Sequence, residues 1–263
     1  MALEPSNNSL LIGSQHIRLK RVHSTNKYAL EFISKSKPME GTVISASYQY
    51  DGRGQIGRFW ESEDGKNITC STILHPIFIQ ASDQFQLNMA VSLALHDLID
   101  HFLPENHKVK IKWPNDIYVG DKKIAGILIQ NTIKGKHIST SVIGTGININ
   151  QVKFSDHIPN PTSLHKLVEM EIDLEIVFGW WFRFLTKRYL QLKSGKLGLL
   201  RKEYLENLYR INVWSKFNDN KGALFAGKIL GVDNDGQLKM ELRDGSIKHF
   251  AFREIQFLIK NEK

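Results

Sequence analysis

Three strand-like segments in a row, joined by two short glycine turns, constrain the fold of this chain more than any other feature. The turns carry Gly120-Asp121 and Gly135-Lys136. Strands joined by connections this short are antiparallel neighbours, so the pattern predicts an antiparallel meander. Pro114 cannot donate a ladder hydrogen bond, so it marks a bend or an edge in the first strand. The three strands are expected at residues 108–119, 123–133 and 138–149.

Helices are expected on both sides of this meander in the sequence. Residues 24–36 begin with Ser and Thr, which are good helix N-caps, and continue with apolar residues that share one helical face. Residues 83–102 form the clearest helix, because apolar side chains recur at helical spacing, Asp83 can cap the start and Pro104 ends it. Residues 173–207 contain two helical stretches separated by a glycine break. Further strands are expected at residues 42–50 and 68–74.

The pattern changes after residue 210. Asp235-Gly236 and Asp244-Gly245 each separate two alternating runs, and Asp-Gly in that position is a strong hairpin signal. The runs lie at residues 222–232, 237–243 and 246–258. We therefore expect a large α/β domain followed by a small β-barrel-like domain.

Composition restricts the class of protein and its partners. Of the 263 residues, 41% are hydrophobic, which is enough for one large core and a small second one. The formal charge of +8 suggests an anionic partner, such as a nucleotide, a nucleic acid or an acidic protein. Neither a signal peptide nor an apolar run of about 20 residues is evident, so no membrane association is expected.

The single cysteine, Cys70, bears on the compartment and on catalysis. One cysteine excludes an intrachain disulfide, which favours a reducing, cytoplasmic location. Cys70 lies in an apolar strand-like run, which predicts a buried thiol rather than a nucleophile.

A glycine-rich loop follows the strand expected at residues 42–50. Gly52, Gly54 and Gly57 fit the spacing of a dinucleotide-binding turn, but that site requires an amphipathic helix directly after the glycines. Residues 58–66 show no helical apolar face and contain a further glycine, so the dinucleotide interpretation is rejected.

The same loop has the composition of a lid over an anionic ligand. Arg53, Gln55 and Arg58 stand among its three glycines. Glycine lets backbone amides approach a ligand closely, and arginine supplies paired donors for a carboxylate or phosphate. Trp60 directly after the loop is an apolar anchor, which indicates that the loop folds back onto the protein rather than remaining a solvated surface loop.

Two further motifs combine glycine and lysine in neighbouring strands. Lys123 begins a strand whose Gly126 has no side chain, so this strand can bring an ammonium group beside a flat ligand. Gly144 and Gly146 lie in the next strand and again suggest a close approach to the backbone. A hairpin with a surface lysine is the alternative. Both motifs follow the run Lys112-Trp113-Pro114-Asn115-Asp116.

Together and in this order, these motifs resemble the biotin protein ligase family. The resemblance covers residues 15–150 strongly and the C-terminal region only in outline. Its most specific part is the lysine-tryptophan-proline-asparagine-aspartate run followed by lysine-x-x-glycine-isoleucine-leucine. The segments that carry it are Ser24-Thr25-Asn26, Gln49, and residues 52–60, 112–116, 123–128 and 144–148.

This resemblance implies an α/β (α+β) fold. A class II synthetase-like catalytic domain, related to lipoate ligases, with a mixed, largely antiparallel sheet and helices, is implied over residues 1–210, and an SH3-like β-barrel over residues 211–263. The implied activity is that of a biotin–[acetyl-CoA-carboxylase] ligase. Biotin and ATP give biotinyl-5′-AMP and pyrophosphate, and the biotinyl group then moves to a lysine of a biotin carboxyl carrier domain. Mg²⁺ is implied together with ATP.

Site residues carry over position by position from this resemblance. Lys123 matches the family lysine that meets the biotin carboxylate and the α-phosphate. The biotin-binding residues are expected to be Ser24, Thr25, Asn26, Gln49, Arg53, Gly54, Gln55, Lys123, Gly126 and Ile127. The nucleotide-binding residues are expected to be Arg58, Trp60, Asn115 and Asn148. The catalytic cations are expected to be Lys123, Arg53 and Arg58, with no metal ligand among the side chains.

The chain departs from the family pattern within the loop. The best-known members place arginine where this chain has Gln55, and often a basic residue where it has Ile56. Glutamine keeps a hydrogen-bond donor but lacks the charge. The substitution therefore predicts a weaker hold on the adenylate and leaves the reaction class unchanged.

Three other functions stay open at this point. A lipoate or octanoate ligase on the same fold shares the lysine but needs a longer, more apolar pocket. A biotin-responsive DNA-binding regulator carries an N-terminal winged helix, for which the 23 residues before Ser24 are too few, so no specific nucleic-acid partner is expected. A catalytically inactive biotin-binding module is disfavoured by the presence of Arg53, Lys112, Lys123 and Asn148. Both a monomer and a homodimer are compatible with the sequence.

Overall fold

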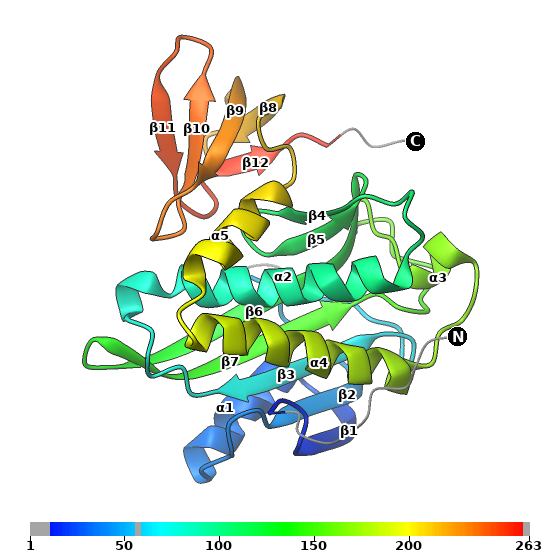
Figure 1. Cartoon of the computed structure of the whole chain (residues 1–263). Coiled ribbons are helices and arrows are strands. Elements are labelled where there is room, and N and C mark those ends of the chain that lie inside the picture. The colour runs from blue at the N-terminus through cyan, green and yellow to red at the C-terminus, as the bar shows by residue number, and fades with distance from the viewer. Residues whose placement is uncertain (1–10, 56–58, 260–263) are drawn as a thin grey trace.

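The computed structural model describes residues 11–55 and 59–259. It contains two β-sheets, and helices flank the larger one (Figure 1). The larger part contains β1 (His16–Val22), α1 (Thr25–Lys35), β2 (Val43–Gln49), β3 (Ile68–Leu74), a 3₁₀ turn (Ala81–Asp83), α2 (Phe85–Phe102), β4 (Val109–Lys112), β5 (Asp116–Val119), β6 (Lys122–Lys134), β7 (His137–Ile147), α3 (Leu164–Val168), α4 (Leu174–Lys193) and α5 (Leu197–Glu206). The C-terminal part contains β8 (Trp214–Asp219), β9 (Leu224–Val232), β10 (Leu238–Leu242), β11 (Ile247–Phe250) and β12 (Ile255–Phe257).

The larger sheet has seven strands in the order β1-β2-β3-β7-β6-β5-β4. β1 and β2 are parallel, and the other neighbouring pairs are antiparallel. β5, β6 and β7 confirm the expected antiparallel meander, with Gly120 and Gly135 at positive φ in its two turns. The sheet is therefore mixed and largely antiparallel, as the resemblance implied.

Residues 108–119 do not form the single strand expected. They form β4 and β5, which pair antiparallel with Lys112 opposite Asp116. The turn between the two strands contains a cis peptide bond between Trp113 and Pro114. Pro114 lacks the amide hydrogen that a continuous ladder would need, and it lies just after the edge strand β4, where the chain folds back on itself.

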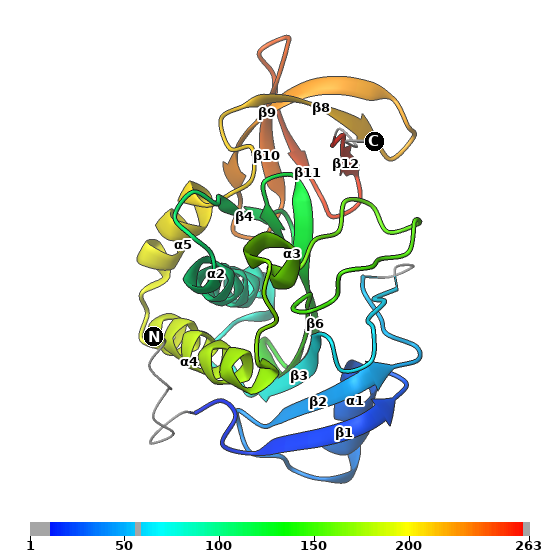
Figure 2. The ribbon, with the colours of Figure 1, turned by 90° about the vertical axis from the view of Figure 1, so that its right-hand side faces the viewer.

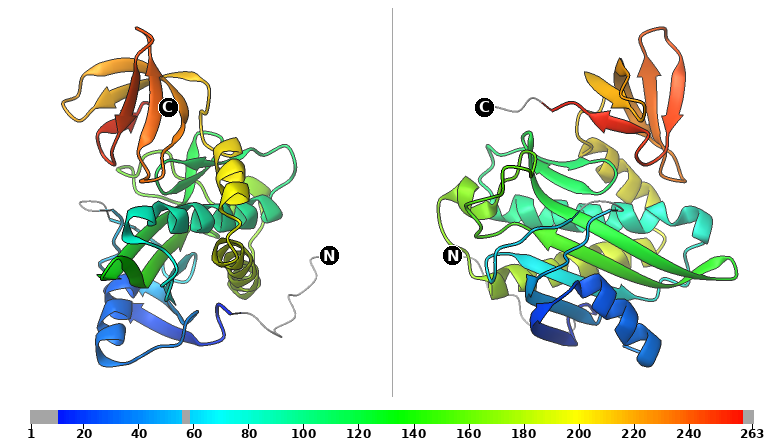
Figure 3. Two further views of the ribbon diagram at one scale, coloured as in Figure 1. Left: turned by 60° about the vertical axis from the view of Figure 1, so that its left-hand side comes forward. Right: turned by 180° about the vertical axis from the view of Figure 1, so that it is seen from behind.

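Helices cover the two faces of this sheet unequally. α2 and α4 lie against one face and share its main hydrophobic core, whereas α1 lies on the opposite face (Figure 2). Seen from behind, α1 stands in front of the sheet (Figure 3). On this side a small core joins Ala29 of α1 to Ile44, Ile73 and Val142. Beyond this small core, β6 and β7 form the rest of the sheet face on which α1 lies. The candidate site is on that part of the face.

The expected helices are present, with one correction at the start of α2. Asp83 does not cap this helix, because it belongs to the preceding 3₁₀ turn and Gln84 stands at the N-cap without a side-chain hydrogen bond. β1, α3 and β8 were not expected from the sequence. In β1 the charged residues Arg18, Lys20 and Arg21 blur the apolar alternation, which is common in a strand at the edge of a sheet.

Cys70 is fully buried, as expected. Burial raises the pKa of its thiol to about 12, so the thiolate that a nucleophile requires is absent near neutral pH. Within the described part of the chain, the helices are too short or too polar to cross a membrane.

The C-terminal sheet is antiparallel, in the order β11-β10-β9-β8-β12, so the run expected at residues 246–258 divides into two strands. It packs against the turn between β4 and β5. The Trp113 indole N–H donates to the Gly236 carbonyl at 2.9 Å, and the rings of Trp113 and Phe252 lie 5.3 Å apart. Buried side chains of both sheets belong to one continuous hydrophobic core. We propose that the boundary between the two parts lies between residues 210 and 211.

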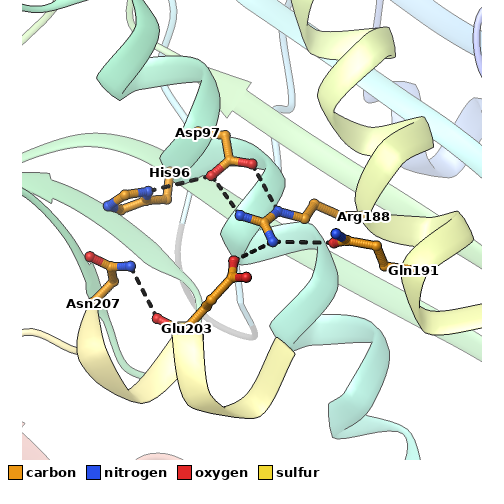
Figure 4. A network of polar contacts seen from close by, with 6 residues as sticks. All are labelled: His96, Asp97, Arg188, Gln191, Glu203 and Asn207. Carbon is orange, nitrogen blue, oxygen red and sulfur yellow. Dashed lines mark hydrogen bonds and ion pairs between the residues drawn. The ribbon is translucent and has the colours of Figure 1, made fainter. Parts of the chain in front are cut away.

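An ion-pair network ties α2, α4 and α5 together (Figure 4). Arg188 of α4 donates to both carboxylate oxygens of Asp97 in α2, at 2.8 and 2.9 Å, and also to Glu203 of α5. Burial alone would raise the pKa of Asp97, but hydrogen bonds from His96 and Arg188 lower it below its usual value. The network therefore holds three helices in a fixed arrangement against the sheet.

Candidate active site

Two glycines that face each other on β6 and β7 form a flat shelf on the α1 face of the sheet. Gly126 and Gly146 are partners in the strand register. The Trp60 indole lies on them: a Cβ atom on Gly146 would lie 2.3 Å from Trp60 Cε2, and one on Gly126 would lie 3.3 Å from Trp60 Cζ3. The expected close approach to these strands is thus made by a flat aromatic side chain, and Trp60 anchors its loop on the sheet.

Lys123 stands at the edge of this shelf. Its Nζ lies 5.7 Å from the centroid of the Trp60 ring and 2.6 Å from Asp116 Oδ1. Its backbone is also held, because the Lys123 N–H donates to the Asn160 carbonyl at 2.7 Å and the Lys123 carbonyl accepts from the Thr162 N–H at 2.9 Å. The two charged side chains are only 30% and 16% exposed, so solvent screens this cation less than it would a free surface lysine.

A buried polar cluster occupies the first turn of α1 on the same face of the sheet. Ser24, Thr25 and Asn26 are all buried there. Gln49 Oε1 accepts from the Thr25 backbone N–H at 2.8 Å and from the Thr25 hydroxyl at 3.1 Å. Gln49 Nε2 lies 3.2 Å from the position of a Cβ atom on Gly52, so its amide group faces the glycine loop. The cluster can therefore present both donors and acceptors to a polar ligand group.

The loop that follows β2 is closed at its base. The Trp60 N–H donates to the Gly52 carbonyl at 2.9 Å, and Arg53 forms a β-bridge with Phe59. Arg53 pairs at the surface with Asp51 at 3.1 Å, with 59% of its side chain exposed. Phe59 is 81% exposed. Arg53 is thus held by a carboxylate on its own loop.

Part of the expected site lies outside the described residues, namely Arg58 together with Ile56 and Gly57. Gly54 and Gln55 belong to the described part of the loop. Ile127 is buried in β6, directly after the shelf glycine Gly126.

Asn115 and Asn148 bind backbone carbonyls around the site. Asn115 Nδ2 donates to the Ile127 carbonyl at 2.6 Å, which fastens the turn between β4 and β5 to β6. Asn148 Nδ2 donates to the Thr162 carbonyl at 2.9 Å. Because Thr162 in turn holds the backbone of Lys123, Asn148 fixes the segment that positions this lysine.

The segment after β7 supplies a wall that the sequence pattern did not reveal. Asn160 and Thr162 lie in a stretch without periodicity, so nothing marked them as neighbours of Lys123. Glu61, next to Trp60, binds this segment through His157 at 3.3 Å and through Ser155. A cleft of about 500 Å³ between the two segments is lined by Tyr48, Glu61, Ser62, Glu63, Gln151, Lys153, Phe154 and Ser155.

Comparison with known proteins identifies this arrangement. Residues 19–148 match the model of the biotin/lipoate A/B protein ligase family. The bifunctional ligase/repressor BirA of Bacillus spizizenii is 31% identical over 248 residues, covering 92% of this chain and 74% of the relative. The biotin–[acetyl-CoA-carboxylase] ligase of Paracoccus denitrificans is 32% identical over 132 residues, covering 50% of this chain and 53% of the relative.

The fold of this chain is also similar to that of a biotin protein ligase. The structure of the biotin protein ligase from Aquifex aeolicus in complex with biotin and ATP superposes with a TM-score of 0.77 at 22% identity, covering 94% of this chain and 100% of that one. Sequence identity over most of the length and agreement of the whole fold lead to one assignment. This chain belongs to the biotin/lipoate protein ligase family and, within it, to the biotin protein ligases.

Proposed function

We propose that this protein activates biotin with ATP to biotinyl-5′-AMP and then transfers the biotinyl group to a lysine of a biotin carboxyl carrier domain. The observation that carries this proposal is the position of Lys123 at the edge of the Gly126–Gly146 shelf, with a buried polar cluster at the N-terminus of α1 on the same face. A ligand with a polar bicyclic head and a carboxylate tail fits this arrangement, with its head at the polar cluster and its carboxylate at Lys123.

In the first step a biotin carboxylate oxygen attacks the α-phosphorus of ATP, and pyrophosphate leaves. Two unit negative charges about 4 Å apart repel by about 4 kcal/mol at an effective dielectric of 20. Lys123, partly buried and held at both its backbone and its Nζ, offsets this repulsion without reorganising. Arg53 would add positive charge once it turns from Asp51 toward the ligand, and Arg58 is proposed to supply a further cation. The carboxylate is ionised at pH 7, so this step needs no general base.

Biotin recognition is assigned to the α1 cluster and the adjoining loop. We propose that Ser24, Thr25, Asn26, Gln49, Gly54 and Gln55 surround the ureido ring and that Gly126, the backbone of Ile127 and Lys123 follow the chain to the carboxylate, since the Ile127 side chain packs into the main core on the opposite face. The nucleotide would lie against Trp60, whose flat ring already contacts the sheet, with Asn115 and Asn148 holding the backbone around it. Arg58 completes this set from outside the described residues.

Mg²⁺ is proposed to enter with ATP. The described residues hold no group of three or more His, Cys, Asp or Glu side chains that would bind a metal ion. Mg²⁺ keeps several of its waters and is commonly held largely by substrate phosphates, so it would not require a protein cage. The bound ion would neutralise phosphate charge.

In the second step the amine of the acceptor lysine attacks the biotinyl carbonyl, and AMP leaves. The amine must be neutral to attack, so a proton has to be removed. Asp116 is the proposed acceptor of this proton, because its carboxylate lies beside Lys123 at the expected carboxylate end of biotin. Retained transfer from preformed adenylate in Asp116→Asn would remove this role.

A lipoate or octanoate ligase is the second candidate on this fold. Thr25 is buried and Gln49 partly buried, and an apolar chain or a dithiolane ring would leave the free acceptor site of Thr25 Oγ1 and the Gln49 Nε2 group without a ligand partner, at about 1–3 kcal/mol for each unpaired group. The test incubates the protein with MgATP and biotin, lipoate or octanoate and detects the adenylate by mass spectrometry. We expect adenylate with biotin only, and adenylate with lipoate at equal rate would contradict the proposal.

A further inference from the structure

We propose that Ser71 is a positioning residue for biotin recognition: together with Asn26 it holds the Thr25 hydroxyl so that its remaining lone pair accepts a ureido N–H of biotin. Ser71 lies in β3 and belongs to none of the motifs that mark the family in this sequence. The inference rests on the proposed function, because the ureido group is the part of the ligand that it concerns.

Two hydrogen-bond acceptors hold the Asn26 side-chain amide in one orientation. Its Nδ2 donates to the Leu128 carbonyl at 3.3 Å and to Gln130 Oε1 at 3.1 Å, so both amide protons are used within the protein. Its Oδ1 therefore faces Ser71 and can only accept. Gly144, the partner of Ser71 in the strand register, leaves the room for this, because a Cβ atom there would lie 2.3 Å from Asn26 Oδ1.

Ser71 connects Asn26 to Thr25. The fully buried Ser71 hydroxyl donates its one proton to Asn26 Oδ1 at 2.5 Å, and its oxygen lies 2.8 Å from Thr25 Oγ1. These two contacts place the Ser71 oxygen between the side chains of two successive residues of α1. Rotation of the Thr25 side chain to another rotamer would break its contact with Ser71.

The contacts of the Thr25 hydroxyl decide whether it can donate a hydrogen bond to a ligand or accept one. The Thr25 backbone N–H can only donate, and it donates to Gln49 Oε1 at 2.8 Å, which fixes this atom as an acceptor. The one proton of the Thr25 hydroxyl is used within the protein, because it has two acceptors beside it, Ser71 Oγ at 2.8 Å and Gln49 Oε1 at 3.1 Å. A hydroxyl has one donor and two acceptor sites, so what Thr25 Oγ1 has left for a ligand is an acceptor. The N–H groups of a ureido ring match it, whereas a carbonyl oxygen does not.

The test compares Ser71→Ala and Ser71→Cys with the wild type. Cysteine keeps the side-chain volume but is a weak hydrogen-bond partner, so the pair separates packing from hydrogen bonding. Both variants are expected to raise the biotin KM by about tenfold, the effect of one lost hydrogen bond, with the ATP KM unchanged. Ser141→Ala is the matched control, because Ser141 is a buried serine on β7 that donates to Asn131 Oδ1 at 2.7 Å.

A second measurement asks whether Ser71 acts through the ureido N–H. Biotin binding is measured by calorimetry for biotin and for its two analogues with one methylated ureido nitrogen. In the wild type, one of the two analogues should bind at least about tenfold more weakly than biotin. In Ser71→Ala the ratio of the analogue Kd to the biotin Kd should be smaller, since coupled contacts are not additive. Equal ratios in both proteins, or an unchanged biotin KM in both Ser71 variants, would overturn the inference.

Failure of the proposed function would look different. Wild-type protein that binds no biotin and forms no adenylate contradicts the function itself. Wild-type protein that forms biotinyl-5′-AMP, with Ser71 variants that match Ser141→Ala in biotin KM, contradicts only the role of Ser71. A purely structural role would lower the thermal unfolding midpoint of Ser71→Ala and leave the biotin KM unchanged.

Discussion

At the scale of single residues, the structure brings Lys123, Gly126 and Trp60 of the predicted motifs together on one face of the sheet, and it adds contacts that no motif predicted. Lys123 and the shelf glycines were singled out by the resemblance of their motifs, taken together, to the family pattern, since each motif alone also fits an ordinary hairpin with a surface lysine. Ser71 could not be singled out, because a serine in a buried strand leaves no signal in the sequence. The role proposed for Ser71 rests on its contacts with Asn26 and on the room left by Gly144, which the fold brings beside it.

The contact between Trp60 and Gly146 gives a prediction for one substitution. Gly146→Ala places a Cβ atom 2.3 Å from the Trp60 ring, so the indole must leave the shelf. We expect adenylate formation to fall by about tenfold or more, as displacement of a positioned group by about 1 Å commonly does. Gly198→Ala is the control, because open space surrounds a Cβ atom there. Equal activity of both variants would contradict a role for the shelf.

His16 gives a prediction about pH and stability. Its Nε2 pairs with Ser45 Oγ at 2.8 Å, and burial, followed by the charge of Arg18, lowers its pKa from 6.5 to about 4. Between these values the unfolded chain binds more protons than the folded one, so stability falls as pH drops from 6.5 toward 4. The loss is about 1–2 kcal/mol after allowance for partial exposure.

The measurement for His16 is the denaturant midpoint as a function of pH. His16→Gln keeps a side-chain hydrogen-bonding group near Ser45 but cannot titrate. The variant should therefore lose less stability than the wild type between pH 6.5 and pH 4. Parallel curves for the two proteins would mean that His16 is not the group responsible.

At the scale of helices and strands, clear periodicity was enough to predict most elements. α1, α2 and the meander have long apolar patterns, and they form where expected. The elements that were missed are short or polar: β1 is an edge strand with Arg18, Lys20 and Arg21, and β8 has only one buried residue, Phe217. The fold-back at Pro114 was missed because a proline alone does not distinguish a bent strand from a hairpin.

The ion-pair network among three helices predicts a large effect of one substitution. Arg188→Met leaves Asp97 and Glu203 in a partly buried place without their cation. We expect a loss of about 3–5 kcal/mol in the free energy of unfolding, as is usual when one partner of a buried pair is removed. Lys202→Met, which breaks an exposed pair with Glu206, should cost less than about 0.5 kcal/mol. Equal effects in chemical denaturation would contradict this account.

At the scale of the whole molecule, the sequence predicted two parts but not how closely they are joined. The change of pattern after residue 210 coincides with the start of the second sheet, yet that sheet shares one hydrophobic core with the first. Trp113 belongs to the most specific motif, and its indole N–H binds Gly236 of the C-terminal part. Such long-range contacts leave no local signal in a sequence.

This shared core predicts cooperative unfolding. Scanning calorimetry should show one transition for both sheets, because separating them exposes the buried side chains of Trp113 and Phe85. Trp113→Phe removes the hydrogen bond to Gly236 and should lower the free energy of unfolding by about 1 kcal/mol without splitting the transition. Two separate transitions in the wild type would mean that the C-terminal sheet folds on its own.

The most direct test of the central claim is formation of biotinyl-5′-AMP from biotin and MgATP, measured by mass spectrometry on wild type, Lys123→Ala and Lys122→Ala. Lys122 is the matched control, since it is the exposed lysine one position earlier in β6. We predict adenylate in the wild type and in Lys122→Ala and almost none in Lys123→Ala. Absence of adenylate in the wild type, or equal amounts in all three proteins, would contradict the account.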